Sequence, residues 1–273
     1  MIPSDFQFAT ILANTMNWNM ATEDFKFITS LEPEGCFVVF QGSERVGIAT
    51  SINFGNIGWF GNLIVKEKYR SKGAGNLLVR YSINYLQSKG VKTIGLYAYP
   101  NLHNFYSNLG FERDEDFSLL RTESLCPISP ESLPKVEKQQ IKTIEMFDTG
   151  FFGGNRKKLL ESIILEKGNL SYYYSKNSHV VGYVAATVYE SMTWVGPLIC
   201  EENNADAAIS LLKAVLSKVT NKSVYLVLPK KEAVLLNMLF SMGFKEDFSV
   251  SRMFLGEPTG KNCVYLAESL ERG

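Results

Sequence analysis

The sequence is poor in the residues that bind metals and form disulfides. Its 273 residues include two histidines and four cysteines, and the cysteines are scattered along the chain at positions 36, 126, 200 and 263. None of the spacings typical of a protein metal site is present, so no metal site is predicted. Because no export signal is found, the cysteines are expected to be reduced thiols of a cytoplasmic protein.

The sequence also lacks long apolar runs and any excess of charge. It has no stretch of about 20 apolar residues, and residues 1–6 are not a basic segment that leads into an apolar one. We therefore expect neither a membrane span nor a membrane partner. Lysine and arginine together number 28, as do aspartate and glutamate. This balance argues against nucleic acid as a partner.

A glycine-containing turn between an apolar strand and a helix is the most informative local feature. Residues 63–65 are typical of a strand, and residues 70–75 (Arg-Ser-Lys-Gly-Ala-Gly) lead directly into a helical pattern. Glycine lets the backbone approach a pyrophosphate, and the free amides and positive dipole end of a helix attract phosphate. The turn is neither a Walker loop nor a dinucleotide fingerprint. Taken alone, it is equally well a solvated turn.

The helix after the turn is well marked. Lys89 and Gly90 supply a cation and a stop at its end, and a strand is expected over residues 91–99. Its apolar residues are predicted to share one buried face: Ala74, Leu77, Leu78, Tyr81, Tyr85 and Leu86.

The turn resembles the acetyl-CoA loop of the GNAT (GCN5-related) N-acetyltransferases. The family pattern is Gln/Arg-x-x-Gly-x-Gly/Ala, and residues 70–75 fit every fixed position. Residues 104–111 (Asn-Phe-Tyr-Ser-Asn-Leu-Gly-Phe) resemble a second family element, the short helix and Gly-Phe turn that close the CoA site. The resemblance implies acetyl-CoA as the cofactor.

The same resemblance assigns the cofactor contacts. The strand before the loop would offer backbone groups to pantetheine, and the loop amides would hold the pyrophosphate beside the charges of Arg70 and Lys72. The predicted cofactor-binding residues are Leu63, Ile64, Val65, Arg70, Ser71, Lys72, Gly73, Ala74, Gly75, Asn76 and Asn104.

Tyr106 matches the family tyrosine that commonly protonates the departing CoA thiolate. A positioned proton donor is what a thiolate needs. The alternative is a residue that only packs with Phe105 and Leu109. His103 lies three residues before Tyr106 and can share its helical face, which places an imidazole near the thioester as a lesser possibility.

No base for the amine is singled out by spacing. Many GNAT enzymes carry a glutamate on the strand that leads into the loop, but residues 59–62 read Trp-Phe-Gly-Asn here. Glu23, Asp24 and Glu67 are candidates only, because most aspartates and glutamates are solvated surface charges.

The acceptor site is predicted by resemblance near Trp18, Asn19 and Glu23, together with Asn17. An aromatic wall with one carboxylate would suit a small amine cation. The alternative is a capped helix with Trp18 in the core. Two later stretches could add a wall to this pocket: residues 151–154 (Phe-Phe-Gly-Gly) and the tyrosines at 172–174. The tyrosines equally suit a hairpin, where they would cover the sheet.

An internal repeat indicates a duplicated domain. Residues 59–64 recur as residues 194–199 at an offset of 135, and residues 104–111 are echoed by residues 237–244. The segment 124–140 contains three prolines and is typical of a linker. We predict a catalytic domain over residues 1–130 and a degenerate one over residues 131–273.

The second copy has lost the residues that carry the chemistry. Residues 205–210 align with the loop but contain no glycine, and Asp206 would repel a diphosphate. Leu239 stands where Tyr106 stands and cannot give a proton. Only the first copy is expected to bind CoA and to catalyse.

The predicted fold class is therefore α/β (α+β), with two tandem GNAT folds, each a mixed, mostly antiparallel central sheet flanked by helices. Residues 17–19 and 147–157 resemble the YitH-like subgroup, which has a degenerate C-terminal GNAT domain. The predicted activity is transfer of an acetyl group from acetyl-CoA to a primary amine of a small molecule or peptide. A non-catalytic CoA or acyl-CoA sensor is the alternative, and a scaffold without acetyl-CoA affinity is a third. The protein is expected to be a monomer.

Overall fold

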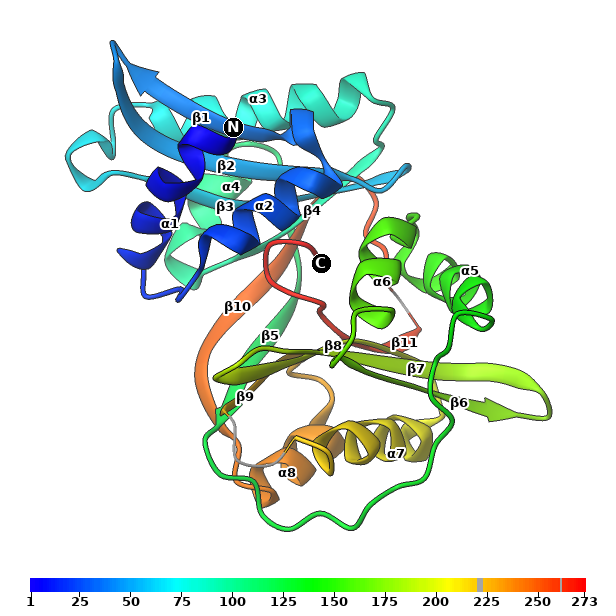
Figure 1. The fold of residues 1–273 in the computed structure, drawn as a ribbon. Coiled ribbons are helices and arrows are strands. Elements are labelled where there is room, and N and C mark those ends of the chain that lie inside the picture. The colour runs from blue at the N-terminus through cyan, green and yellow to red at the C-terminus, as the bar shows by residue number, and fades with distance from the viewer. Residues whose placement is uncertain (220–222, 261) are drawn as a thin grey trace.

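The computed structural model describes residues 1–219, 223–260 and 262–273. Within these residues, 11 strands form one continuous sheet that runs through both halves of the chain (Figure 1). The strand order is β1-β2-β3-β4-β10-β5-β9-β8-β7-β6, and β11 pairs with β8 outside that path. The pairs β3–β4 and β8–β9 are parallel and the others are antiparallel. The predicted mixed, mostly antiparallel α/β fold is therefore confirmed.

The two halves have the same order of elements, as the repeat predicts. The first half contains α1 (Phe6–Asn14), α2 (Thr22–Leu31), β1 (Cys36–Gln41), β2 (Glu44–Asn53), β3 (Ile57–Val65), α3 (Ala74–Ser88), β4 (Thr93–Ala98), α4 (His103–Ser107) and β5 (Glu112–Thr122). The second contains α5 (Ile141–Phe152), α6 (Lys157–Ile164), β6 (Leu170–Lys176), β7 (His179–Val188), β8 (Met192–Glu201), α7 (Ala205–Leu216), β9 (Ser223–Pro229), α8 (Ala233–Ser241) and β10 (Lys245–Leu255), followed by β11 (Cys263–Leu266).

The last strands of the two halves are exchanged. Strand β10 of the second half lies between β4 and β5 of the first, and β5 in turn pairs with β9 of the second half (Figure 1). Phe117 of β5 faces Val250 of β10. These residues are 133 positions apart, as are Phe111 and Phe244 of the two Gly-Phe turns, so they correspond to each other in the two copies. The sheet thus crosses the predicted domain boundary near residue 131.

The apolar core is also shared by the two halves. One cluster of buried side chains combines Trp59 and Phe117 of the first half with Ile144, Tyr183 and Tyr265 of the second. A second cluster lies under α7, and a third lies under α3. Because both halves fill the same core, their relative position is fixed by burial of apolar surface.

The tyrosine run at residues 172–174 forms part of the β6–β7 hairpin, as one prediction states. Tyr172 and Tyr174 pack on the cluster under α7, whereas Tyr173 packs on the shared core. Alternate tyrosines therefore cover opposite faces of the sheet.

Helix α3 begins at the predicted turn, but its buried face is narrower than predicted. Leu78, Val79 and Leu86 are buried against the sheet, whereas Leu77 and Tyr81 are 56% and 59% exposed. Among the helices in the described part of the chain, none is long and apolar enough to cross a membrane.

Candidate active site

Strands β3 and β4 are paired along only part of their length. They pair in parallel at Ile57↔Thr93, Gly58↔Ile94 and Trp59↔Gly95, and the pairing stops there although β3 continues to Val65. In the described residues, no strand pairs with this edge of β3 beyond Trp59. This edge of β3 from residue 60 to residue 65 therefore has no strand partner, and a strand edge without a partner can pair with a ligand in extended conformation.

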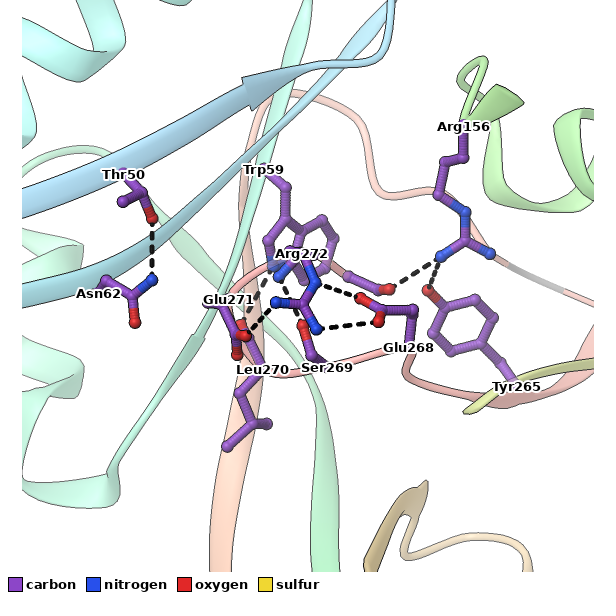
Figure 2. Close-up of polar contacts among 11 residues, drawn as sticks. Thr50, Trp59, Asn62, Arg156, Tyr265, Glu268, Ser269, Leu270, Glu271 and Arg272 are labelled. Carbon is purple, nitrogen blue, oxygen red and sulfur yellow. Dashed lines mark hydrogen bonds and ion pairs between the residues drawn. The ribbon is translucent and has the colours of Figure 1, made fainter. Parts of the chain in front are cut away.

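A bulge in β3 lies beside this unpaired edge. The register of the β2–β3 pair changes between Ile48↔Ile64 and Thr50↔Gly61, so that β3 carries one extra residue. Asn62 is buried at the bulge with a φ of 49°, and its Nδ2 donates to Thr50 Oγ1 at 3.2 Å (Figure 2). A bulge redirects the backbone groups that follow it, here those of the predicted pantetheine strand.

The predicted phosphate loop adopts the strained backbone that its sequence suggests. After the short 3-10 helix Glu67–Tyr69, Ser71 has a φ of 58° and Gly73, the residue before α3, has a φ of 89°. A Cβ on Gly73 would meet open space, so its backbone conformation, not crowding, favours glycine there. At Gly75 a Cβ would make an ordinary contact with Phe105 at 3.7 Å. The loop is thus adjacent to α4.

The charges around the loop are held by specific partners. Arg70 Nε donates to the carbonyl oxygen of Val65 at 3.0 Å, which ties the loop to the end of β3. Tyr69 and Lys66 donate to Glu44, and these hydrogen bonds lower the pKa of Glu44 to about 2. Lys72 Nζ lies 5.7 Å from the centre of the Tyr69 ring. A rigid, cationic loop of this kind suits a diphosphate.

Tyr106 lies in α4 on the same side of β3 as the loop helix. Its ring is buried among the rings of Phe60, Phe105 and Phe111 at centroid distances between 5.0 and 6.4 Å. This burial raises the pKa of the Tyr106 phenol well above its ordinary value. Like an ordinary tyrosine, the phenol is protonated at neutral pH and can donate a hydrogen bond.

The remaining residues of α4 are less enclosed. Asn104, a predicted cofactor-binding residue, is exposed at the start of α4. The Nε2 atom of His103 is buried without a hydrogen-bond partner. Phe105 places this helix beside the loop, and the cofactor contact of Asn104 and the catalytic role of Tyr106 remain predictions.

The predicted acceptor residues lie in the connection between α1 and α2 and at the start of α2. Trp18 Nε1 donates to the Tyr99 hydroxyl at 3.2 Å, and Tyr99 packs on Phe248 of β10. Asn19 is exposed with a φ of 50°. Glu23 is exposed and pairs with Lys26 at 3.2 Å. The neighbouring carboxylate of Asp24 accepts a hydrogen bond from the Ala21 amide at the start of α2.

The corresponding edge in the second half has a strand partner. Strands β8 and β9 pair from Met192↔Ser223 to Val195↔Leu226, and β11 then pairs with β8. The Ala267 amide also donates to Val227 of β9 at 3.1 Å. A Cβ on Gly196 would lie 2.0 Å from the Ala267 carbonyl oxygen. In the described residues, β8 therefore has a strand partner at the position where β3 has none.

Beyond β11, residues 267–273 cross from the second half to β3 and end between the two halves (Figure 1). Trp59 Nε1 donates to the carbonyl oxygen of Leu270 at 3.2 Å, and Arg156 Nη1 donates to that of Gly273 at 2.8 Å (Figure 2). Arg156 is fully buried, pairs with Asp148 and lies over the Phe152 ring.

Sequence analysis did not identify this 267–273 segment as part of the site. The only signal is Gly61 in the interior of β3, because a strand glycine often marks the close approach of another backbone. A Cβ on Gly61 would lie 2.6 Å from the Cα of Glu271.

Residues 151–154 also pack on the first half, at the paired end of β3. Phe152 contacts Trp59 and Phe54 with ring centroids 6.1 and 5.5 Å apart, and a Cβ on Gly154 would lie 2.9 Å from the Phe54 carbonyl oxygen. Their role as a wall of the acceptor pocket remains a prediction.

The unpaired edge, bulge, loop and buried tyrosine together define a candidate acyl-transfer site, and comparison with known families agrees. Residues 8–111 match the acetyltransferase (GNAT) family and residues 144–265 match an acetyltransferase (GNAT) domain. The chain therefore belongs to the GNAT acetyltransferases. It is a tandem member with one GNAT domain in each half, as predicted. Its placement in the YitH-like subgroup remains a prediction.

Solved structures share this architecture. A putative acetyltransferase from Pyrococcus horikoshii is 20% identical over 100% of this chain and 94% of its own, with a TM-score of 0.79. A GCN5-related N-acetyltransferase from Sphaerobacter thermophilus is 12% identical, with 93% of each chain covered and a TM-score of 0.68. A tandem GNAT protein from the clavulanic acid biosynthesis pathway is 12% identical over 92% of this chain and 95% of its own, with a TM-score of 0.62. At these identities the likeness establishes the fold. No curated protein sequence matches the chain.

Proposed function

We propose that this protein is an acetyl-CoA-dependent N-acetyltransferase that acetylates a primary amine of a small molecule or peptide by direct attack. One observation carries the proposal. In the described residues of the first half, β3 has no strand partner on this edge beyond Trp59, whereas in the second half β11 pairs with the equivalent part of β8. The site is therefore assigned to the first half.

The residues of the first half fit acetyl-CoA. The positive φ angles of Ser71 and Gly73 and the open space at Gly73 suit a loop whose amides surround a pyrophosphate. The free edge of residues 63–65 can hydrogen-bond the amide groups of pantetheine. When bound, acetyl-CoA supplies an activated thioester.

Two groups of the protein would stabilise the charges that develop. A strand amide near Leu63 or Ile64 would donate to the carbonyl oxygen as it becomes negative. Tyr106 would donate its phenol proton to the departing thiolate. The attacking amine must be neutral and must lose a proton after attack, so a proton acceptor is needed near the acetyl carbonyl.

A non-catalytic CoA or acyl-CoA sensor is the second candidate. One reason for the sensor is Gly61, because β3 has no carboxylate of its own at this position. A second reason is the 267–273 segment, which packs over Gly61. The two candidates share the cofactor site and differ only in turnover.

Calorimetry with acetyl-CoA, followed by detection of CoA release with a panel of amines, tests the proposal. Binding with amine-dependent CoA release supports the enzyme, and Tyr106→Phe should then slow release without weakening binding. Binding without turnover on any amine favours the sensor. Absence of binding contradicts both.

A further inference from the structure

The two faces of β3 have different surroundings. Phe60 and Leu63 point to the cluster that contains Tyr106 and α3, so the cofactor elements lie on that face. Trp59 and Gly61 point to the opposite face, where the 267–273 segment lies. Since side chains alternate along a strand, this second face is the one from which an amine can reach the unpaired edge without crossing the cofactor.

The backbone of Glu271 occupies the space that a Cβ atom at position 61 would need. A Cβ on Gly61 would lie 2.6, 2.7 and 2.8 Å from the Cα, Cβ and carbonyl oxygen of Glu271. Position 61 therefore accepts only glycine, and the space that its side chain would fill belongs to Glu271. The second half thus brings a glutamate to the point on β3 where the strand itself carries no side chain.

Glu271 and Glu268, the two acids of the 267–273 segment, differ in burial and in their hydrogen bonds. Glu268 is buried, and both of its oxygens accept hydrogen bonds from Arg272, at 2.8 and 3.0 Å. Glu271 is only partly buried and accepts from Arg272 through Oε1 alone, at 2.7 Å. In the described part of the chain, Oε2 of Glu271 accepts no hydrogen bond from another residue. Glu268 thus holds the arginine in place, while Glu271 retains a free oxygen.

The groups that face Glu271 come from three elements. Arg272 and Glu268 lie on its own segment, Asp24 on α2, and Tyr189 follows β7. Burial raises the pKa of Glu271, the repulsion of Glu268 and Asp24 adds to this effect, and Arg272 opposes it. Three carboxylates against one guanidinium leave a negative surrounding, which attracts a cationic amine.

We propose that Glu271 binds the acceptor amine and takes its proton, so that the second half completes the active site of the first. This inference rests on the proposed function. The bound ammonium first releases one proton to solvent, the lone pair freed in this way forms the N–C bond to the acetyl carbonyl, and the C–S bond breaks. The surplus proton on nitrogen passes to the Glu271 carboxylate, and the thiolate takes the Tyr106 proton. Solvent then restores both groups. The acceptor is an aliphatic primary amine that is protonated in solution.

Glu271→Gln is the sharpest test because the amide oxygen can still accept the hydrogen bond from Arg272. We expect thermal stability and calorimetric acetyl-CoA affinity to remain near those of the parent. We expect kcat/KM for the best amine to fall roughly 10²- to 10⁴-fold, the range for loss of a general base. The acidic limb of the parent's kcat/KM profile should disappear. Glu271→Asp keeps the charge and should recover part of the activity.

The control is Glu123→Gln, a change of the same kind at a carboxylate that is 69% exposed and pairs with Arg121. It should leave all three measurements unchanged. The proposal is overturned if Glu271→Gln keeps the parent's kcat/KM and pH profile, or if it loses acetyl-CoA affinity together with activity. If the parent itself binds no acetyl-CoA, the proposed function fails, and this result is distinct from the first two.

Discussion

Arg156 donates to both carboxylate oxygens of Asp148, at 3.1 and 2.6 Å, and neither side chain is exposed to solvent. The same guanidinium donates to the Gly273 carbonyl oxygen, so this buried pair in the second half anchors the 267–273 segment on β3. A buried ion pair tolerates the loss of one partner poorly, because the other charge is left without compensation.

We therefore expect Asp148→Asn to destabilise the protein by about 3–5 kcal/mol. The released segment should also raise KM for the amine more than it weakens acetyl-CoA binding. Urea unfolding and steady-state kinetics measure the two effects. Glu123→Gln, which removes the surface pair with Arg121, should cost about 0–1 kcal/mol. Equal effects of the two substitutions would contradict the anchoring role.

Tyr106→Phe removes the proposed proton donor and keeps the ring that packs on Phe60 and Phe111. We expect kcat to fall roughly 10²- to 10⁴-fold with little change in acetyl-CoA affinity. Stopped-flow detection of the free thiol separates this step from binding. Tyr81→Phe, on the exposed side of α3, is the matched control and should not alter kcat. A Tyr106→Phe enzyme with the parent's kcat would leave the tyrosine a packing residue only.

Gly73→Ala places a side chain at a φ of 89°, which strains the backbone by about 1–2 kcal/mol and distorts the loop. Acetyl-CoA affinity should fall. Gly42→Ala imposes similar strain, at a φ of 60° with open space around it, in the turn between β1 and β2. It should lower stability by a similar amount and leave affinity unchanged. Calorimetry and thermal unfolding on both variants decide between a specific loop effect and general strain.

Gly61→Ala drives a Cβ into the backbone of Glu271, which cannot move as a flexible side chain can. We expect a loss of about 1–3 kcal/mol and a larger loss of amine turnover, because the segment must shift. Gly150→Ala is the control, since Gly150 lies inside α5 with nothing within 4 Å of its Cβ position. It should stabilise the protein by about 0.5–1 kcal/mol. A harmless Gly61→Ala would contradict the close packing of β3 and the 267–273 segment.

The sequence predicts the local features well. The loop at residues 70–75, the tyrosine of α4 and the duplication depend on residue types at short spacing, and the structure brings the loop and α4 together. The buried face of α3 was predicted too broadly. Leu77 and Tyr81 suit the helical period, but the sheet covers only the stripe through Leu78, Val79 and Leu86.

The non-local features could not be predicted. Strands β5 and β10 are equivalent copies, so their patterns do not say which half each one joins. The bulge at Asn62 and the β8–β11 pair depend on pairings between segments far apart in the chain. Glu271 was missed for the same reason, since it reaches β3 from the other end of the sequence.

The exchange of β5 and β10 makes the catalytic half incomplete by itself. In a fragment that stops at residue 130, β4 would lack a strand partner on one edge and β5 would lack one on both edges. Unpaired strand edges of this kind pair with other chains and promote aggregation. We therefore expect the first half to need the second half in order to fold. Heat or denaturant should melt the two halves in a single step, and co-expressed fragments should regain activity only by reassembling.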